Sequence, residues 1–117
     1  MDHLLPATDF KTLILLVLGK RKRLRVAGNS MLPLLRSGTE ILYAPRAYQK
    51  SPPQVGDIVV THHPQQPKLL IVKKVQEVTV VGDCFLIGYN PAASTDSRHW
   101  GLISYKQLLG KVTNRFC

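Results

Sequence analysis

The apolar and polar positions divide the chain into one helical segment followed by a series of short strands. Residues 8–18 can form a helix, with Thr8 or Asp9 as the N-cap, an apolar face after the cap, and Gly19 at its end. From Leu24 onward, short apolar or alternating runs are separated by Gly, Pro and Asp, which is typical of an all-β domain with tight turns. The pattern predicts a mainly β fold, a small, strongly bent antiparallel sheet with a short N-terminal helix.

The individual strands are expected where these runs occur. Residues 45–55 hold three prolines and should form a surface loop, and Gly82-Asp83 should form a hairpin turn. The expected strands are residues 23–27, 39–44, 57–62, 68–78, 84–88 and 110–114.

Length and composition limit this fold to one compact unit. The 117 residues can build one hydrophobic core, and the 44% hydrophobic content excludes a disordered chain. We therefore expect a single domain over residues 1–117, in which residues 1–22 form the helix and a basic segment and residues 23–117 form the β core.

The chain is strongly basic, which bears on the partners it could bind. Sixteen Lys and Arg against seven Asp and Glu give a formal charge of +9, and much of the excess lies in residues 20–25, directly after the apolar run 13–18. A run this short cannot span a bilayer, which needs about 20 apolar residues. Two alternatives remain: a helix packed on the core, or peripheral membrane contact through residues 13–25.

Cysteine and histidine positions do not indicate a metal site. Cys84 and Cys117 make no metal-ligand spacing, and free thiols favour a cytoplasmic location. His62 and His63 would point to opposite faces of a strand and make a poor chelating pair. We expect no metal and no cofactor.

Ser30 is the first candidate for chemistry. It lies in Gly28-Asn29-Ser30-Met31-Leu32-Pro33, where the chain must leave a strand and turn, with Pro33 suited to open a short helix. A serine hydroxyl is a poor nucleophile unless a neighbouring base activates it. A plain turn serine is the alternative.

Lys73 is the candidate base. On a strand, Lys73 shares its face with Leu69, Ile71 and Val75, whereas Lys74 lies on the other face. Burial lowers a lysine pKa and can leave the amine neutral, as a general base requires. The alternative is an edge-strand lysine in water.

A third block, Ser94 to Gly101, places an acid, a base and hydroxyl groups close together. By itself it could be a polar loop held by an Asp96–Arg98 pair.

In this order, the three blocks resemble the signal peptidase I and LexA-like family of Ser/Lys proteases, whose signature is Ser-Met-x-Pro, a strand bearing Lys, then Gly-Asp-Asn and Ser-x-Asp-Ser-Arg. The resemblance runs from about Arg25 to Gly110 and implies the bent β fold. It also implies a serine endopeptidase with Ser30 as nucleophile and Lys73 as base. Residues 88–98 look most like the nickel-type superoxide dismutase maturation proteases, which implies a protein precursor, that enzyme with its N-terminal propeptide, as substrate.

The resemblance also implies roles for the flanking residues. Ser94 would hydrogen-bond Lys73, and Asp96 and Arg98 would brace the loop. The oxyanion would be stabilised by the Ser30 amide, with help from the Asn29 side chain. Met31 and Pro33 are assigned to substrate binding.

Two departures from the family pattern and two rival functions stay open. Tyr89 replaces the aspartate of Gly-Asp-Asn, and Gly28 stands where some relatives carry a serine. The rivals are a signal-peptidase-like enzyme at the membrane surface and a non-enzymatic basic module that holds nucleic acid or anionic lipid. We expect no nucleic-acid partner.

Overall fold

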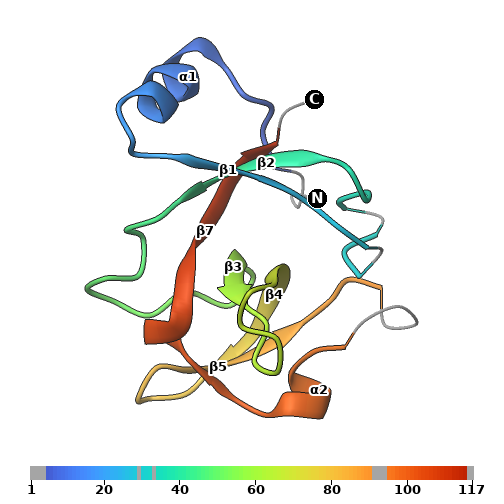
Figure 1. The fold of residues 1–117 in the computed structure, drawn as a ribbon. Helices are drawn as coiled ribbons and strands as arrows, with labels where there is room; N and C mark the ends of the chain where they lie inside the picture. The colour runs from blue at the N-terminus through green and yellow to red at the C-terminus, as the bar shows by residue number, and fades with distance from the viewer. Residues whose placement is uncertain (1–4, 29, 33, 91–94, 116–117) are drawn as a thin grey trace.

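The computed structural model describes residues 5–28, 30–32, 34–90 and 95–115. Figure 1 shows a curled sheet with one helix at each of two opposite ends. The helical elements are α1 (Phe10–Val17), α2 (Ser97–Trp100) and the 3-10 helix η2 (Tyr105–Gln107). The strands are β1 (Lys22–Arg25), β2 (Glu40–Ala44), β3 (Ile58–His62), β4 (Leu70–Val78), β5 (Asp83–Ile87), β6 (Ile103–Ser104) and β7 (Leu108–Arg115).

The strands form one antiparallel sheet in the order β1-β2-β7-β3-β4-β5-β6. The last strand of the chain, β7, lies between β2 and β3 and joins the two halves of the sheet. Register shifts in the β2–β7, β3–β7 and β4–β5 pairs accompany its curvature. The predicted mainly β fold with a strongly bent antiparallel sheet is confirmed.

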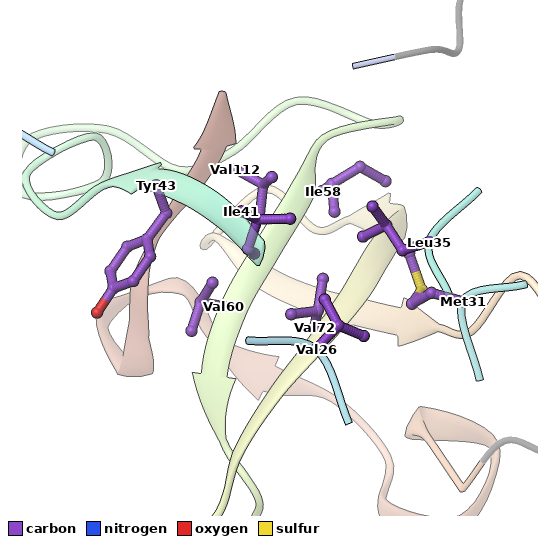
Figure 2. Packing of buried hydrophobic residues seen from close by; sticks show 9 residues of the cluster. All are labelled: Val26, Met31, Leu35, Ile41, Tyr43, Ile58, Val60, Val72 and Val112. Atoms are coloured by element: carbon purple, nitrogen blue, oxygen red, sulfur yellow. The ribbon is translucent and has the colours of Figure 1, made fainter. Parts of the chain in front are cut away.

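Apolar side chains fill two clusters on the two faces of the sheet. Along β3, Ile58 and Val60 belong to the first cluster, whereas Val59 belongs to the second. Figure 2 shows the first cluster, where Met31 and Leu35 from the β1–β2 loop pack beside Val72 of β4. The loop that bears Ser30 is therefore held against the sheet by its own buried residues.

Gly110 permits the close approach of β7 to β2. A Cβ atom at this position would collide with the Ala44 carbonyl oxygen and would lie 2.7 Å from Cδ2 of Tyr43. Only glycine fits between these strands without a backbone shift.

All six predicted strands and the N-terminal helix are present, within about two residues at each end. The short elements α2, β6 and η2 were not predicted. The β4–β5 turn is also displaced from its predicted position, because its tip is Val80-Val81 and Asp83 already belongs to β5.

Helix α1 begins as predicted, and most of its apolar side chains are exposed. The Asp9 side chain accepts hydrogen bonds from the Thr12 amide and hydroxyl at 2.8 and 2.7 Å, which caps the helix. Thr12 is its one buried residue. Leu15 and Leu16, on the same side as Thr12, are half-buried, whereas Phe10, Leu13, Ile14 and Val17 are exposed. The sequence left packing on the core and membrane contact as alternatives, and the structure shows packing through the Thr12 side alone. No helix in the described ranges is long and apolar enough to cross a bilayer.

Candidate active site

Ser30 lies in the loop that joins β1 to β2. The loop is closed at its base by bonds from the Val26 amide to the Thr39 carbonyl and from the Gly38 amide to the Val26 carbonyl, at 2.8 and 2.7 Å. Gly28 adopts a φ of +81°, a conformation that favours glycine. The sequence therefore places a sharp bend two residues before Ser30, whose side chain is partly exposed.

A backbone hydrogen bond ties this loop to the far end of the sheet. The Asn90 amide donates to the Ser30 carbonyl oxygen at 2.7 Å. Asn90 follows β5, whose last residue Ile87 pairs with Lys74 of β4. The segment that leaves β5 beside β4 thus runs directly to the Ser30 loop.

Lys73 is buried in the middle of β4. Its side chain is 3% exposed, and it pairs in register with Val59 of β3. Strand alternation places it on the same face as Val59 and Val75, both in the second apolar cluster. Burial lowers the pKa of the Lys73 amine; the Asp96 charge opposes this shift and the Arg98 charge adds to it. The predicted burial of Lys73, rather than Lys74, is confirmed.

Lys74 has a different environment, on the other face of β4. Its Nζ lies 5.0 Å from the centre of the Tyr89 ring, a cation–π contact. Tyr89 also packs against the first apolar cluster. Tyr89, which departs from the family pattern, therefore stabilises the packing of this segment.

Asp96 and Arg98 form a buried brace beside β5. The fully buried Asp96 carboxylate accepts bonds from Nε and Nη2 of Arg98 at 2.9 and 2.7 Å. Its Oδ2 also accepts the Gly88 amide at 3.0 Å, and its Oδ1 caps α2 at the Arg98 amide. The pair therefore fixes the backbone that leaves β5 next to Lys73. The predicted Asp96–Arg98 pairing is confirmed.

Ser97 adds a contact that sequence reasoning missed. Its buried hydroxyl oxygen accepts the Leu86 amide at 2.8 Å, so Ser97 and Asp96 bind alternate amides of the same segment. Its place in the Ser-x-Asp-Ser-Arg block was the available signal. Its type gave no indication, because serine is common in polar loops.

A small pocket brings two distant strands together at Ser30. It is lined by Leu24–Ala27, Ser30 and Met31 on one side and by Leu70–Val72 of β4 on the other. The curl of the sheet thus lets β1 and β4 face each other although three strands separate them in the sheet order. Met31 is almost fully buried and lines the floor of the pocket as well as the core.

The remaining predicted residues cannot be placed. Asn29, Pro33 and Ser94 lie outside the described residues, together with Cys117. Around Pro33 the described residues form a turn, in which the Leu35 amide donates to the Met31 carbonyl at 2.8 Å, rather than the expected short helix.

The other chemically active side chains have structural roles. Cys84 is buried, and burial raises the pKa of its thiol to about 11, which opposes thiolate chemistry. His63 is buried against Trp100 in an edge-to-face contact at 4.9 Å, whereas His62 is exposed. Within the described ranges, no three His, Cys, Asp or Glu side chains gather as metal ligands.

Comparison with known proteins assigns a class to this fold and site. Residues 6–79 and 76–117 match the family described as signal peptidase, peptidase S26, and the chain belongs to that family. It is 30% identical over 112 residues to the mitochondrial ATP-independent inner membrane protease subunit 1a of Arabidopsis thaliana, an alignment that covers 77% of this chain and 67% of that protein. It is 39% identical over 74 residues to subunit 1b from the same plant, covering 61% of this chain and 41% of that protein.

Proposed function

We propose that the protein is a serine endopeptidase that processes a protein precursor, with Ser30 as nucleophile and Lys73 as general base. The observation that carries this proposal is the burial of Lys73 among aliphatic side chains, which lowers the pKa of its amine. The adjoining β4 residues Leu70–Val72 line the same pocket as Ser30. Membership of the signal peptidase family supports the reaction type.

The proposed reaction proceeds by acyl transfer. The neutral Lys73 amine takes the proton from the Ser30 hydroxyl while Oγ attacks the carbonyl carbon of the substrate. The C–N bond then breaks, and the Lys73 ammonium returns the proton to the leaving amine. Water hydrolyses the resulting ester by the same route, which frees the acid and restores both side chains.

The oxyanion of the tetrahedral intermediate needs donors that are fixed before reaction. We assign the Ser30 amide to this role and keep the Asn29 side chain as the second candidate. The bond from the Asn90 amide to the Ser30 carbonyl supports this assignment, since it restrains the peptide chain around the nucleophile.

Asp96 and Arg98 are proposed to position the base. Asp96 accepts the Gly88 amide while Arg98 holds the Asp96 carboxylate, and their opposite charges act in opposite directions on the pKa of Lys73. Ser94 is proposed to orient the Lys73 amine.

The substrate is proposed to bind as an extended chain between β1 and β4. β1 is an edge strand, and β5 pairs with β4 only from Lys74 onward, so Leu70–Val72 have an edge without a strand partner among the described residues. An added strand can use such edges for backbone hydrogen bonds. Met31 would form part of the floor, and Pro33 is kept as the second substrate-binding residue.

The particular substrate proposed is the nickel superoxide dismutase precursor. The support is the resemblance of residues 88–98 to the proteases that remove its propeptide. We place this reaction in the cytoplasm, with peripheral membrane contact as the open alternative.

The test mixes the purified chain with that precursor and reads the product by intact mass spectrometry, with Ser30→Ala as the inactive variant. Removal of the propeptide by wild type alone supports nucleophile and substrate together. Equal cleavage by Ser30→Ala contradicts the assigned nucleophile. Cleavage of other precursors by wild type, but not of this one, contradicts the substrate alone.

A further inference from the structure

A second hollow adjoins the Ser30 pocket at β1. It has a volume of about 480 Å³ and opens to solvent. Its charged lining residues are Arg23, Arg25, Arg36 and Glu40, and residues 37–39 of the Ser30 loop complete it. Arg25 lines both this hollow and the Ser30 pocket. The arginine hollow therefore lies next to the place where the substrate is proposed to bind.

The two faces of β1 differ in character. Leu24 packs against the first apolar cluster, whereas Arg23 and Arg25 are exposed. Strand alternation places both arginines on the outer face, away from that cluster. One edge of β1 pairs with β2, and the substrate chain is proposed to lie along the other edge. A chain added there would put every second side chain on the outer face, next to the arginines.

Glu40 shows how this face accepts a carboxylate from a neighbouring strand. It pairs in register with Arg25, and its Oε2 accepts a bond from Nη2 of Arg25 at 2.6 Å. Its Oε1 binds Arg23, and this bond is the main reason why the pKa of the Glu40 carboxyl is lowered. A guanidinium group has five N–H donors and can bind more than one carboxylate. An acidic side chain on the opposite edge of β1 would reach the same two arginines.

Positive charge exceeds negative charge in the arginine hollow. Three guanidinium groups against one carboxylate leave two positive charges in excess. Within the described part of the chain, Arg36 forms no ion pair. Arg25 is also held in place, because its Nη1 donates to the Gly38 carbonyl at 3.0 Å. The hollow thus offers positioned donors for a further carboxylate, which guanidinium groups bind through two parallel hydrogen bonds.

We propose that the arginine hollow selects precursors with Asp or Glu at alternate positions along the segment that binds to β1. This inference rests on the proposed function, from which it takes the position of the substrate. The arginines determine specificity and do not touch the bond that is cut. A nucleic acid would meet the same charges, but only an extended peptide would also use the backbone hydrogen bonds of the free edge of β1.

The first test measures binding without peptidase activity, by fluorescence anisotropy with the Ser30→Ala protein. Two labelled peptides are compared, one alternating Val with Glu and the other alternating Val with Gln. We expect the Glu peptide to bind about five- to tenfold more tightly, with a ratio that falls as salt increases. Adding Arg36→Gln should lower this ratio about threefold. Its matched control Arg46→Gln removes an exposed arginine from the loop after β2 and should leave the ratio unchanged.

Charge reversal distinguishes specificity from structural damage. The double variant Arg23→Glu, Arg25→Glu leaves one arginine and three carboxylates in the hollow. It should prefer a third peptide, with Lys in place of Glu, which damage to β1 would not produce. Glu40→Gln removes the carboxylate that already occupies the arginines, and it should bind the Glu peptide about threefold more tightly than the parent protein.

The outcomes separate this inference from the proposed function. Equal binding of the Glu and Gln peptides, or equal ratios in Arg36→Gln and Arg46→Gln, would overturn the inference whatever the activity. A single-stranded oligonucleotide that binds more tightly than the Glu peptide, and that Arg36→Gln weakens, would assign the hollow to nucleic acid and also overturn it. If wild type leaves every precursor intact while Ser30→Ala shows the expected preference, the peptidase assignment fails and the selection of acidic peptides stands.

Discussion

The Asn90 amide donates to the Ser30 carbonyl at 2.7 Å and joins two segments that are 60 residues apart in the chain. One segment carries the proposed nucleophile, and the other leaves β5 beside the strand that carries Lys73. Geometry at the proposed dyad therefore depends on how β5 and α2 hold this connection. The hydrogen bonds of Asp96, Arg98 and Ser97 hold this connection, so we expect these three residues to affect the proposed reaction by positioning other groups.

Replacing Lys73 by alanine should abolish peptidase activity, a loss of at least about 10²- to 10⁴-fold in kcat, because it removes the proposed general base. Lys74→Ala is the matched control. It removes the cation–π contact with Tyr89, should cost only about 0.5–1 kcal/mol of stability, and should leave turnover nearly unchanged. Circular dichroism should show both variants folded. Comparable activity in Lys73→Ala and wild type would contradict the assigned base.

The value of kcat/KM should rise with pH as Lys73 loses its proton. Asp96 raises the pKa of Lys73 and Arg98 lowers it. Asp96→Asn should therefore lower that pKa further and move the rising limb to lower pH, while Arg98→Gln should move it to higher pH. Shifts of the rising limb in opposite directions would show that the two charges act on the pKa of Lys73. If the substitutions only loosened the loop, kcat would fall in both variants and the two rising limbs would keep the same midpoint.

Lys73→Met should make the protein more stable while it inactivates the enzyme. In wild type, burial lowers the Lys73 pKa below its ordinary value of 10.5. Between these two pKa values the unfolded chain binds more protons, so wild-type stability rises with pH. The gain from methionine, about 1 kcal/mol, should be largest below the lowered pKa of Lys73 and should shrink as pH approaches 10.5. Urea unfolding at several pH values measures it, and a pH-independent difference would contradict this explanation.

Gly110→Ala should destabilise the sheet by about 1–3 kcal/mol, because the new methyl group meets the backbone of β2 and can be accommodated only if strands shift. Thermal unfolding should show a lower Tm. Gly101→Ala provides a comparison in which the added Cβ has open space, although its φ of +81° adds strain of its own. A Gly110→Ala protein as stable as wild type would show that β7 and β2 can separate at no cost.

Much of this architecture follows from local signals in the chain. The alternation around Lys73 separates it from Lys74 because neighbouring strand residues point to opposite faces. Asp9 is recognisable as a cap because its carboxylate accepts hydrogen bonds from Thr12, only three residues later in the chain. Each of these depends on residues close together in sequence, where spacing alone fixes the geometry.

The remainder depends on contacts between distant segments. Nothing near Leu108–Arg115 indicates that β7 inserts between β2 and β3. The four-residue helix α2 has too few residues for a periodic pattern, and it exists because Asp96 caps it while binding Gly88. The exposure of α1 could not be predicted either, since the spacing of apolar residues is the same in a helix that packs on a core and in one that does not.

The connection from α1 to the Ser30 loop fixes the distance between the two. β1 begins five residues after α1, and its four extended residues span about 13 Å before the Ser30 loop begins. This strand, paired along its length with β2, holds the Ser30 loop at a set distance from α1. Any surface that the exposed side of α1 contacts would therefore stand at that same distance from the proposed nucleophile, and a substrate held there would need an extended chain of matching length to reach Ser30.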